Sequence, residues 1–145
     1  MLLPSKMPRS TPRTMKPSDF QVNRTWLAYR INQSPLHAEG QEIDLYVLQD
    51  AASMFLFGNV FAPHGAESPD LKDAHELMEL AFVKKNEWPS ELILPGKPAQ
   101  ENSFAQVAKE HGVAVRSVAE SQLSYFIKDV QESYEEFLAR DNGDA

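Results

Sequence analysis

The stretch that decides the fold is residues 40–60, GQEIDLYVLQDAASMFLFGNV. Residues 42–48 alternate between two faces, Ile43, Leu45 and Val47 against Asp44, Tyr46 and Leu48, and this period of two predicts a β-strand. Residues 50–53 predict a turn that the Asp50 side chain caps. Residues 54–61 begin with an apolar run and predict a second strand, in which Gly58 marks a bulge or a crowded crossing. The stretch therefore predicts an antiparallel hairpin.

Working outward, the flanking sequence predicts an α/β domain. Aromatic and branched residues predict a strand at 24–32, and a loop at 33–40 leads into the hairpin. Beyond the hairpin, a helix ending before Trp88 alternates with a strand at 91–94, a helix at 103–111, a strand at 113–118 and a helix at 120–139. Strands joined through helices favour parallel pairing, so we expect a mixed five-stranded sheet flanked by helices.

Two helix starts carry recognisable capping signals. Ser68 followed by Pro69 predicts the N-cap and first position of the first helix. Ser103 with Gln106 has the form of a capping box, and Gly112 predicts where that second helix ends.

The charge is unevenly distributed along the 145 residues. Residues 1–19 carry four Lys or Arg and one Asp, a net charge of +3, with a proline about every four residues. The whole chain carries −7, so residues 20–145 carry about −10. We therefore expect a disordered basic tail at 1–19, or an arm that docks on a partner or on the acidic face, then a single domain at 20–140 and a frayed end at 141–145. An acidic domain repels phosphate backbones, which disfavours nucleic acid as its partner.

Composition narrows the location and the chemistry. The chain has no cysteine, which excludes disulfides, thiolate metal sites and cysteine catalysis and favours the cytoplasm. No apolar run approaches the roughly 20 residues of a membrane span, so no membrane association is expected.

The order of elements, strand–strand–strand–helix–strand–helix–strand–helix, resembles the ribonuclease H-like core of integrases, transposases and many nucleases. Three local stretches carry the resemblance besides residues 40–60: Trp26-Leu-Ala-Tyr29, WPSELILPG at 88–96 and FAQVAKEHGVAV at 104–115. The resemblance covers residues 24–139. It implies catalytic carboxylates at three positions, which are Tyr29, a place in or next to Pro95, and Glu120 near the start of the last helix.

Two of these three positions lack the oxygen that the chemistry needs. Two-metal phosphoryl transfer holds ions about 4 Å apart between carboxylates. Tyr29 has no carboxylate and Pro95 has no donor side chain, while Glu120 alone does not hold two ions. The residual candidates for a divergent site are Asp44, Asp50 and Glu120.

Other clusters favour structural roles. His64, Asp73 and His75 are weak candidates for a metal site, since they lie close together but lack ligand spacing such as His-x-x-x-His. No phosphate-binding loop or hydrolase elbow occurs, and no cofactor is expected.

The sequence favours a non-catalytic integrase-core-like domain that acts as a binding or scaffolding module for a protein partner or as a homodimer. Two alternatives remain open. The first is a divergent metal-dependent nuclease or transposase-like enzyme using Asp44, Asp50 and Glu120. The second is a nucleic-acid-binding module that works through the basic N-terminal tail.

Overall fold

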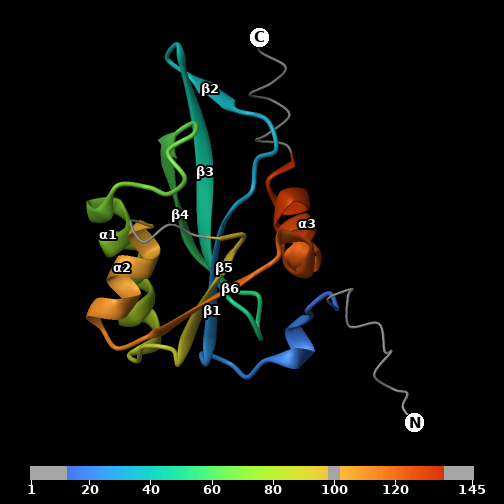
Figure 1. Cartoon of the computed structure of the whole chain (residues 1–145), viewed down its shortest axis with the longest axis vertical. Helices are drawn as coiled ribbons and strands as arrows, with labels where there is room; N and C mark the ends of the chain where they lie inside the picture. Colours follow the sequence, from blue (N-terminus) through green and yellow to red (C-terminus); the bar gives the residue numbers. More distant parts are fainter. Residues whose placement is uncertain (1–12, 98–101, 136–145) are drawn as a thin grey trace.

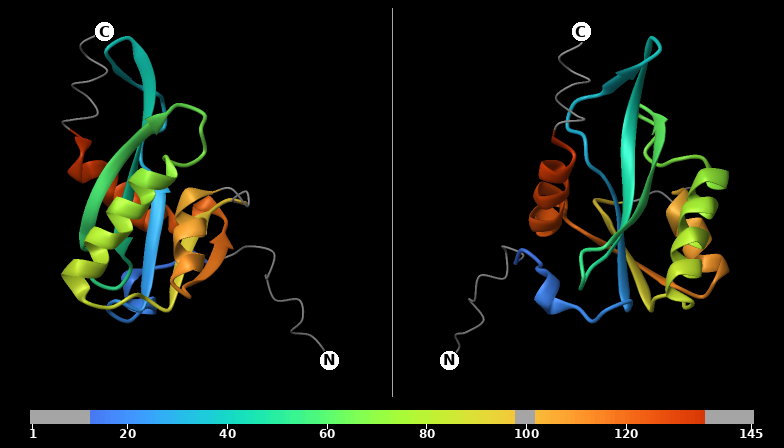
Figure 2. Two further views of the ribbon diagram at one scale, coloured as in Figure 1. Left: turned by 90° about the vertical axis from the view of Figure 1, so that its left-hand side faces the viewer. Right: turned by 180° about the vertical axis from the view of Figure 1, so that it is seen from behind.

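The computed structural model describes residues 13–97 and 102–135, and it is a three-layer α/β structure with the sheet in the middle (Figure 1). The strands are β1 Thr25–Arg30, β2 Leu36–Ala38, β3 Gln41–Asp50, β4 Leu56–Pro63, β5 Glu91–Pro95 and β6 Ala114–Val118. The helices are α1 Leu71–Lys85, α2 Ser103–Glu110 and α3 Ser124–Ser133, with 3-10 turns at Pro17–Asp19 and Glu120–Leu123. Helices α1 and α2 cover one face of the sheet and α3 covers the other (Figure 2).

The long strand β3 organises the sheet. It pairs antiparallel with β4 along one edge, and with β2 and then β1 along the other. Beyond β1 the sheet continues in parallel through β5 to β6. The predicted mixed sheet is thus confirmed, with six strands among the described residues because the predicted loop at 33–40 contains β2.

Alternation along β1 divides the hydrophobic core between the two faces. Trp26 and Ala28 belong to the cluster under α1 and α2, whereas Leu27 and Tyr29 belong to the cluster under α3. All four side chains are at most 1% exposed. A central strand covered on both faces explains why β1 has no polar face.

Gly58 marks both features that the sequence offered as alternatives. The β3–β4 register shifts between Leu48 and Gln49, directly opposite Gly58, as expected of a bulge. A Cβ on Gly58 would lie 2.9 Å from Leu77 Cδ1 of α1, so the crossing is also crowded. The absence of a side chain lets α1 pack closely on β4.

The predicted start of the first helix is wrong by two residues. Helix α1 has Asp70 as its N-cap, and the Ser68 Oγ instead accepts a hydrogen bond from the Ser103 N–H at 3.1 Å. Ser68 therefore connects the chain before α1 to the first residue of α2. At the other end, Asn86 adopts a left-handed conformation and closes the helix before Trp88.

The predicted capping box of α2 is also displaced. Asn102 is the N-cap, and its side chain accepts a hydrogen bond from the Ala105 N–H at 3.1 Å. Ser103 lies one residue inside the helix, and its buried Oγ has no hydrogen-bond partner among the described residues. Gly112, with a φ of +73°, follows the helix as predicted.

The last predicted helix is divided in two. Glu120–Leu123 form a 3-10 turn, closed by a hydrogen bond from the Gln122 N–H to the Ala119 carbonyl at 2.9 Å, and α3 follows from Ser124. Residues 136–139 of the predicted helix, and the predicted frayed end at 141–145, lie outside the described residues.

The segment at 13–19, which the sequence assigned to the tail, packs against the domain. The Met15 N–H donates to the Gln122 carbonyl at 2.8 Å, and the next residue after the segment, Phe20, meets Phe126 edge to face at 6.2 Å between ring centroids. Both Met15 and Phe20 pack against the core cluster under α3. The boundary at residue 19 stays a prediction, and the remainder of the predicted tail, residues 1–12, lies outside the described residues.

Within residues 13–97 and 102–135, no helix combines the length and apolar character that crossing a bilayer requires.

Candidate functional site

A cleft of about 260 Å³ lies where the parallel strands β1 and β5 end. Its lining includes the apolar side chains of Ala28, Leu94 and Ile127 and the aromatic rings of Tyr46 and Phe104. Charged residues from four elements or loops also line it, namely Arg30, Glu67, Lys97 and Glu120. Open α/β sheets commonly bind ligands at the carboxyl ends of their strands, so this cleft is the candidate site.

The topology brings together the three positions that the resemblance named. Tyr29 lies near the end of β1, Pro95 ends β5, and Glu120 begins the 3-10 turn before α3. All three residues line the cleft. The Gly96 N–H donates to the Val118 carbonyl at 2.7 Å, which fixes the chain directly after Pro95. The three positions that the resemblance implied therefore lie around one cleft.

Tyr29 is integrated into the core rather than exposed in the cleft. Its side chain is 1% exposed, and its hydroxyl donates to Gln49 Oε1 at 2.6 Å, while Gln49 Nε2 donates to the Met54 carbonyl at 3.1 Å. Burial, followed by the nearby Asp129 and Tyr134, raises the pKa of the Tyr29 hydroxyl well above its usual range. The group therefore stays neutral and serves as a packed hydrogen-bond donor.

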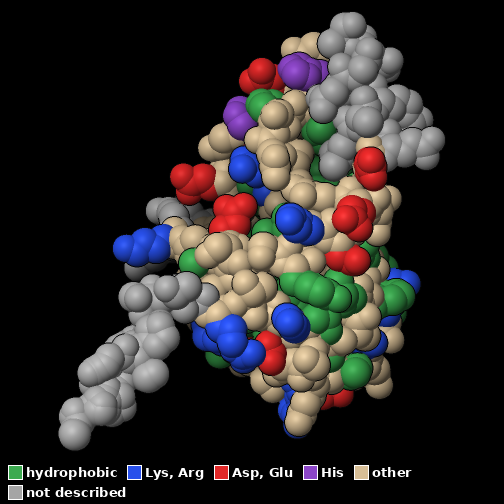
Figure 3. Space-filling model, turned by 90° about the vertical axis from the view of Figure 1, so that its right-hand side faces the viewer, with side chains coloured by type: hydrophobic (Ala, Val, Ile, Leu, Met, Phe, Trp, Pro, Cys, Tyr) green, Lys and Arg blue, Asp and Glu red, His purple; other side chains and the backbone are tan. Residues whose placement is uncertain are grey.

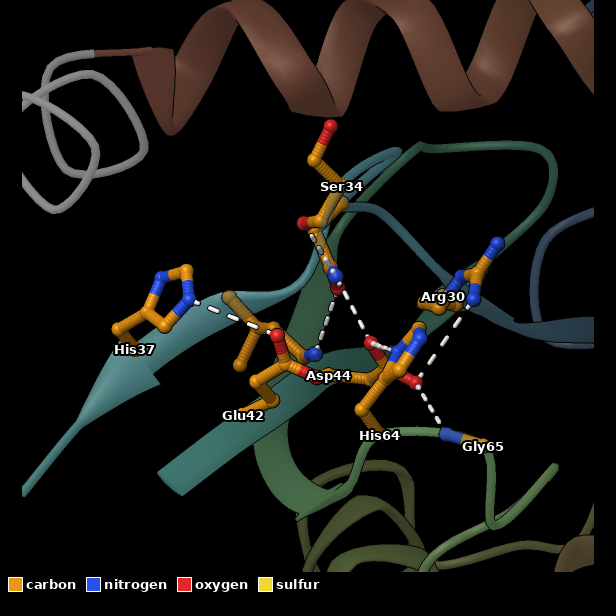
Figure 4. Close-up of polar contacts among 9 residues, drawn as sticks. Arg30, Ser34, His37, Glu42, Asp44, His64 and Gly65 are labelled. Atoms are coloured by element: carbon orange, nitrogen blue, oxygen red, sulfur yellow. Dashed lines mark hydrogen bonds and ion pairs between the residues drawn. The ribbon is translucent and has the colours of Figure 1, made fainter. Parts of the chain in front are cut away.

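Asp44 is held in a polar network beside the cleft (Figure 4). Its carboxylate, 1% exposed, accepts a hydrogen bond from Asn32 Nδ2 at 2.9 Å and lies 3.0 Å from His64 Nδ1. The Gly65 N–H lies 3.4 Å from the other oxygen, and the Arg30 guanidinium is 3.7 Å away. Burial alone would raise the pKa of Asp44, but these partners outweigh it and hold the pKa below its usual value.

The neighbouring Tyr46 hydroxyl also responds to this charge. Burial, and then the negative charge of Asp44, raises the pKa of Tyr46 to about 12. The Tyr46 hydroxyl is therefore neutral near pH 7.

Asp50 lies at the opposite end of β3 and caps the turn, as the sequence predicted. Its side chain accepts hydrogen bonds from the Ser53 N–H at 2.8 Å and the Ser53 Oγ at 2.7 Å. It also accepts one from the Asn23 N–H at 2.7 Å, which joins the turn to the chain before β1. Asp50 is completely buried by these contacts.

The structure does not bring the residual carboxylates Asp44, Asp50 and Glu120 together. Asp44 and Asp50 are six residues apart on one strand, which corresponds to roughly 20 Å. Two-metal sites hold their ions about 4 Å apart, so these two carboxylates do not share such a site.

The weak metal candidates are likewise dispersed. His64 contacts Asp44, whereas His75 on α1 lies between Glu79 of the same helix at 3.4 Å and Glu110 of α2 at 2.9 Å. Asp73 lies in the first turn of α1. Across the described ranges 13–97 and 102–135, no group of three or more Asp, Glu or His is placed to hold a metal ion.

The sequence missed the charged and aromatic lining of the cleft. Arg30 and Tyr46 read as ordinary strand residues, and Glu67 and Lys97 read as loop residues. The available signal was position, because Lys97 follows β5 and Arg30 ends β1, at the edge where parallel strands end.

Comparison with solved structures identifies the fold. A chain of the simian T-cell lymphotropic virus intasome, solved in complex with PP2A regulatory subunit B56 gamma, has a TM-score of 0.62 and 14% identity over 92% of this chain. The match covers 46% of the viral chain, so this protein spans less than half of its length. The catalytic core domain of BIV integrase gives 0.49 and 13%, over 85% of this chain and 74% of that one. The HTLV-2 integrase core in complex with magnesium gives 0.45 and 15%, over 84% and 74%.

No protein-family model matches the sequence, and no curated protein matches it significantly. The likeness to the intasome chain shows the fold alone, because the identity is 14%. The chain has the ribonuclease H-like fold of integrase catalytic cores, as its element order indicated.

Proposed function

We propose that this domain is a protein-binding module that uses the integrase-core-like fold without its polynucleotidyl transfer chemistry. One observation carries the proposal. At the strand ends where the fold places two of its carboxylates, this chain has a buried tyrosine bonded to Gln49 and a proline that ends β5. Glu120 is the third position and supplies one carboxylate, whereas two-metal catalysis needs several on adjacent elements.

The charge of the domain supports a protein partner over nucleic acid. Residues 20–145 carry about −10, which opposes a phosphate backbone. On the face that carries α3, basic and acidic side chains are interspersed rather than gathered into a basic stripe (Figure 3). The viral chain of similar fold was solved in a complex with a protein subunit, and a protein partner for this chain is proposed on the same scaffold.

The surface also supports contact with a protein. Leu80 and Val83 lie three residues apart on α1 and are 46% and 73% exposed. Phe55, just before β4, is 46% exposed, with the Lys85 Nζ 5.7 Å from its ring centroid. A contiguous exposed apolar patch is typical of a surface that meets another protein or a second copy of the chain, and these side chains are proposed as part of one. A cytoplasmic setting, favoured by the absence of cysteine, is part of the proposal.

A cleavage assay tests the proposal. The full chain is incubated with Mg²⁺ or Mn²⁺ and labelled single- and double-stranded DNA and RNA, beside E120Q in the cleft and the matched control E132Q on α3. We expect no cleavage by any of the three proteins. Cleavage that E132Q keeps and E120Q loses would overturn the proposal in favour of the nuclease alternative.

A binding assay with the same oligonucleotides addresses the other alternative. We expect no shift in fluorescence anisotropy at low salt. Binding that weakens steeply as salt rises would instead show a nucleic-acid-binding module.

A further inference from the structure

The cleft is small and has room for one long side chain. Its volume of about 260 Å³ lies below the roughly 300–1,000 Å³ of pockets that hold drug-sized ligands. Its walls include two aromatic rings, Tyr46 and Phe104, whose centroids are 6.3 Å apart, with Ala28 and Leu94 from adjacent strands. These walls suit the aliphatic stem of a long side chain.

The charge of the cleft becomes negative once its internal pairing is counted. The Arg30 guanidinium lies 3.7 Å from the buried Asp44 carboxylate, which neutralises the charge of the arginine (Figure 4). The remaining charged lining residues are Lys97 against Glu67 and Glu120, which gives a net charge of −1.

The two carboxylates reach the cleft from separate parts of the fold. Glu67 comes from the loop between β4 and α1, and Glu120 from the turn before α3. Both residues are exposed, so their carboxylates remain hydrated in the free protein. A cation at the mouth of the cleft can therefore contact them, and neither carboxylate has to be buried first.

We propose that this cleft binds a lysine or arginine side chain of a basic segment in a partner protein. The aliphatic stem of that side chain contacts the aromatic walls, and its cationic head is neutralised by Glu67 and Glu120. The acidic balance of residues 20–145 attracts the same class of partner over longer distances. The inference rests on the proposed protein-binding function and names the partner's chemistry.

The test uses a short fluorescent peptide in which arginine alternates with glycine, with glutamine and glutamate versions as comparators. Binding to the full chain is measured by anisotropy at two salt concentrations. The E67Q/E120Q variant removes both cleft carboxylates, and E76Q/E132Q removes two exposed glutamates on α1 and α3 with the same change in net charge. Unfolding curves confirm that both variants are folded.

We expect the arginine peptide to bind and E67Q/E120Q to weaken its affinity about fivefold, the factor expected from two partly exposed charge pairs. The E76Q/E132Q control is expected to change the affinity by less than about twofold, since it alters only the long-range field. Backbone amide shifts at Tyr46 and Phe104 during the titration would place the peptide in the cleft.

Three results would overturn the inference: equal weakening by both double variants, preference for the glutamate peptide, or no binding of the arginine peptide. None of these affects the cleavage assay. Failure of the peptide test without nuclease activity leaves the proposed function standing, whereas cleavage lost in E120Q removes the proposed function itself.

Discussion

Asp44 is a buried carboxylate whose four polar neighbours all favour its charged form. Asn32, His64 and the Gly65 N–H surround its oxygens, and Arg30 adds a positive charge. The same network joins the chain after β1 to β3, because Asn32 Oδ1 also accepts from the Leu45 N–H at 2.7 Å. The contacts of Asp44 with His64 and Gly65 extend it to the loop after β4. Asp44 therefore contributes to stability and fixes Arg30 at the edge of the cleft.

The lowered pKa of Asp44 makes its contribution depend on pH. The folded-state pKa lies below the unfolded value of about 3.9, so the stabilisation is present above about pH 4 and is lost as pH falls through the folded-state pKa. We expect D44N to lower the free energy of unfolding by about 1–3 kcal/mol at pH 7. The difference from the wild type should shrink at pH 3.

Urea unfolding of the wild type and D44N at pH 7 and pH 3 measures this difference in the free energy of unfolding. The exposed E132Q is the control, and its unfolding curve is expected to stay close to that of the wild type. A difference between wild type and D44N that is as large at pH 3 as at pH 7 would contradict the linkage.

At the scale of elements, the start of α2 offers a matched pair of substitutions. Asn102 caps the helix, whereas the buried Ser103 Oγ has no hydrogen-bond partner within residues 13–97 and 102–135. We expect N102A to destabilise the protein by about 1 kcal/mol. S103A should be neutral or slightly stabilising, because it removes a buried hydroxyl that makes no hydrogen bond.

Chemical denaturation of the two variants in parallel measures the difference. A larger loss for S103A than for N102A would show that Ser103 caps the helix in solution, as the capping-box pattern had predicted.

The element scale also shows which features the sequence could reveal. The periodic spacing of apolar residues predicted five of the strands and three helices. This signal is readable in long elements such as β3, because burial of one face places apolar residues at regular intervals. The cap predictions at Ser68 and Ser103 were wrong because a hydroxyl close to a helix start has several possible hydrogen-bond partners. Tertiary packing decides which partner it meets, as in the bond between the Ser103 N–H and the Ser68 Oγ. Strand β2 was missed because three residues flanked by Pro35 and Gly40 carry no readable period.

The candidate site was likewise predictable only in part. Element order was enough to bring Tyr29, Pro95 and Glu120 to one cleft, because parallel strands end at the same edge. The side chains that give the cleft its charge were not predictable, since Glu67 and Lys97 arrive from loops whose paths depend on the whole fold.

At the scale of the whole molecule, residues 13–20 pack against α3 and the 3-10 turn that precedes it. Met15 bonds to Gln122, and Phe20 packs on Phe126. We expect a chain beginning at residue 21 to be less stable than one beginning at residue 13 by about 2 kcal/mol, the scale of two partly buried apolar side chains, Met15 and Phe20. Thermal unfolding of the two truncated proteins measures the contribution, and equal midpoints would show that this segment does not stabilise the domain.

The bond between Tyr29 and Gln49 has a consequence for how this fold can change over time. A carboxylate in place of Tyr29 would put a charge into an apolar layer and leave the Gln49 oxygen without its donor. An acidic residue at position 29 alone would therefore weaken the protein, because the buried charge and the unpaired Gln49 oxygen both cost free energy. A change at Tyr29 is tolerated only together with a matching change at Gln49, so we expect the two positions to covary among related sequences.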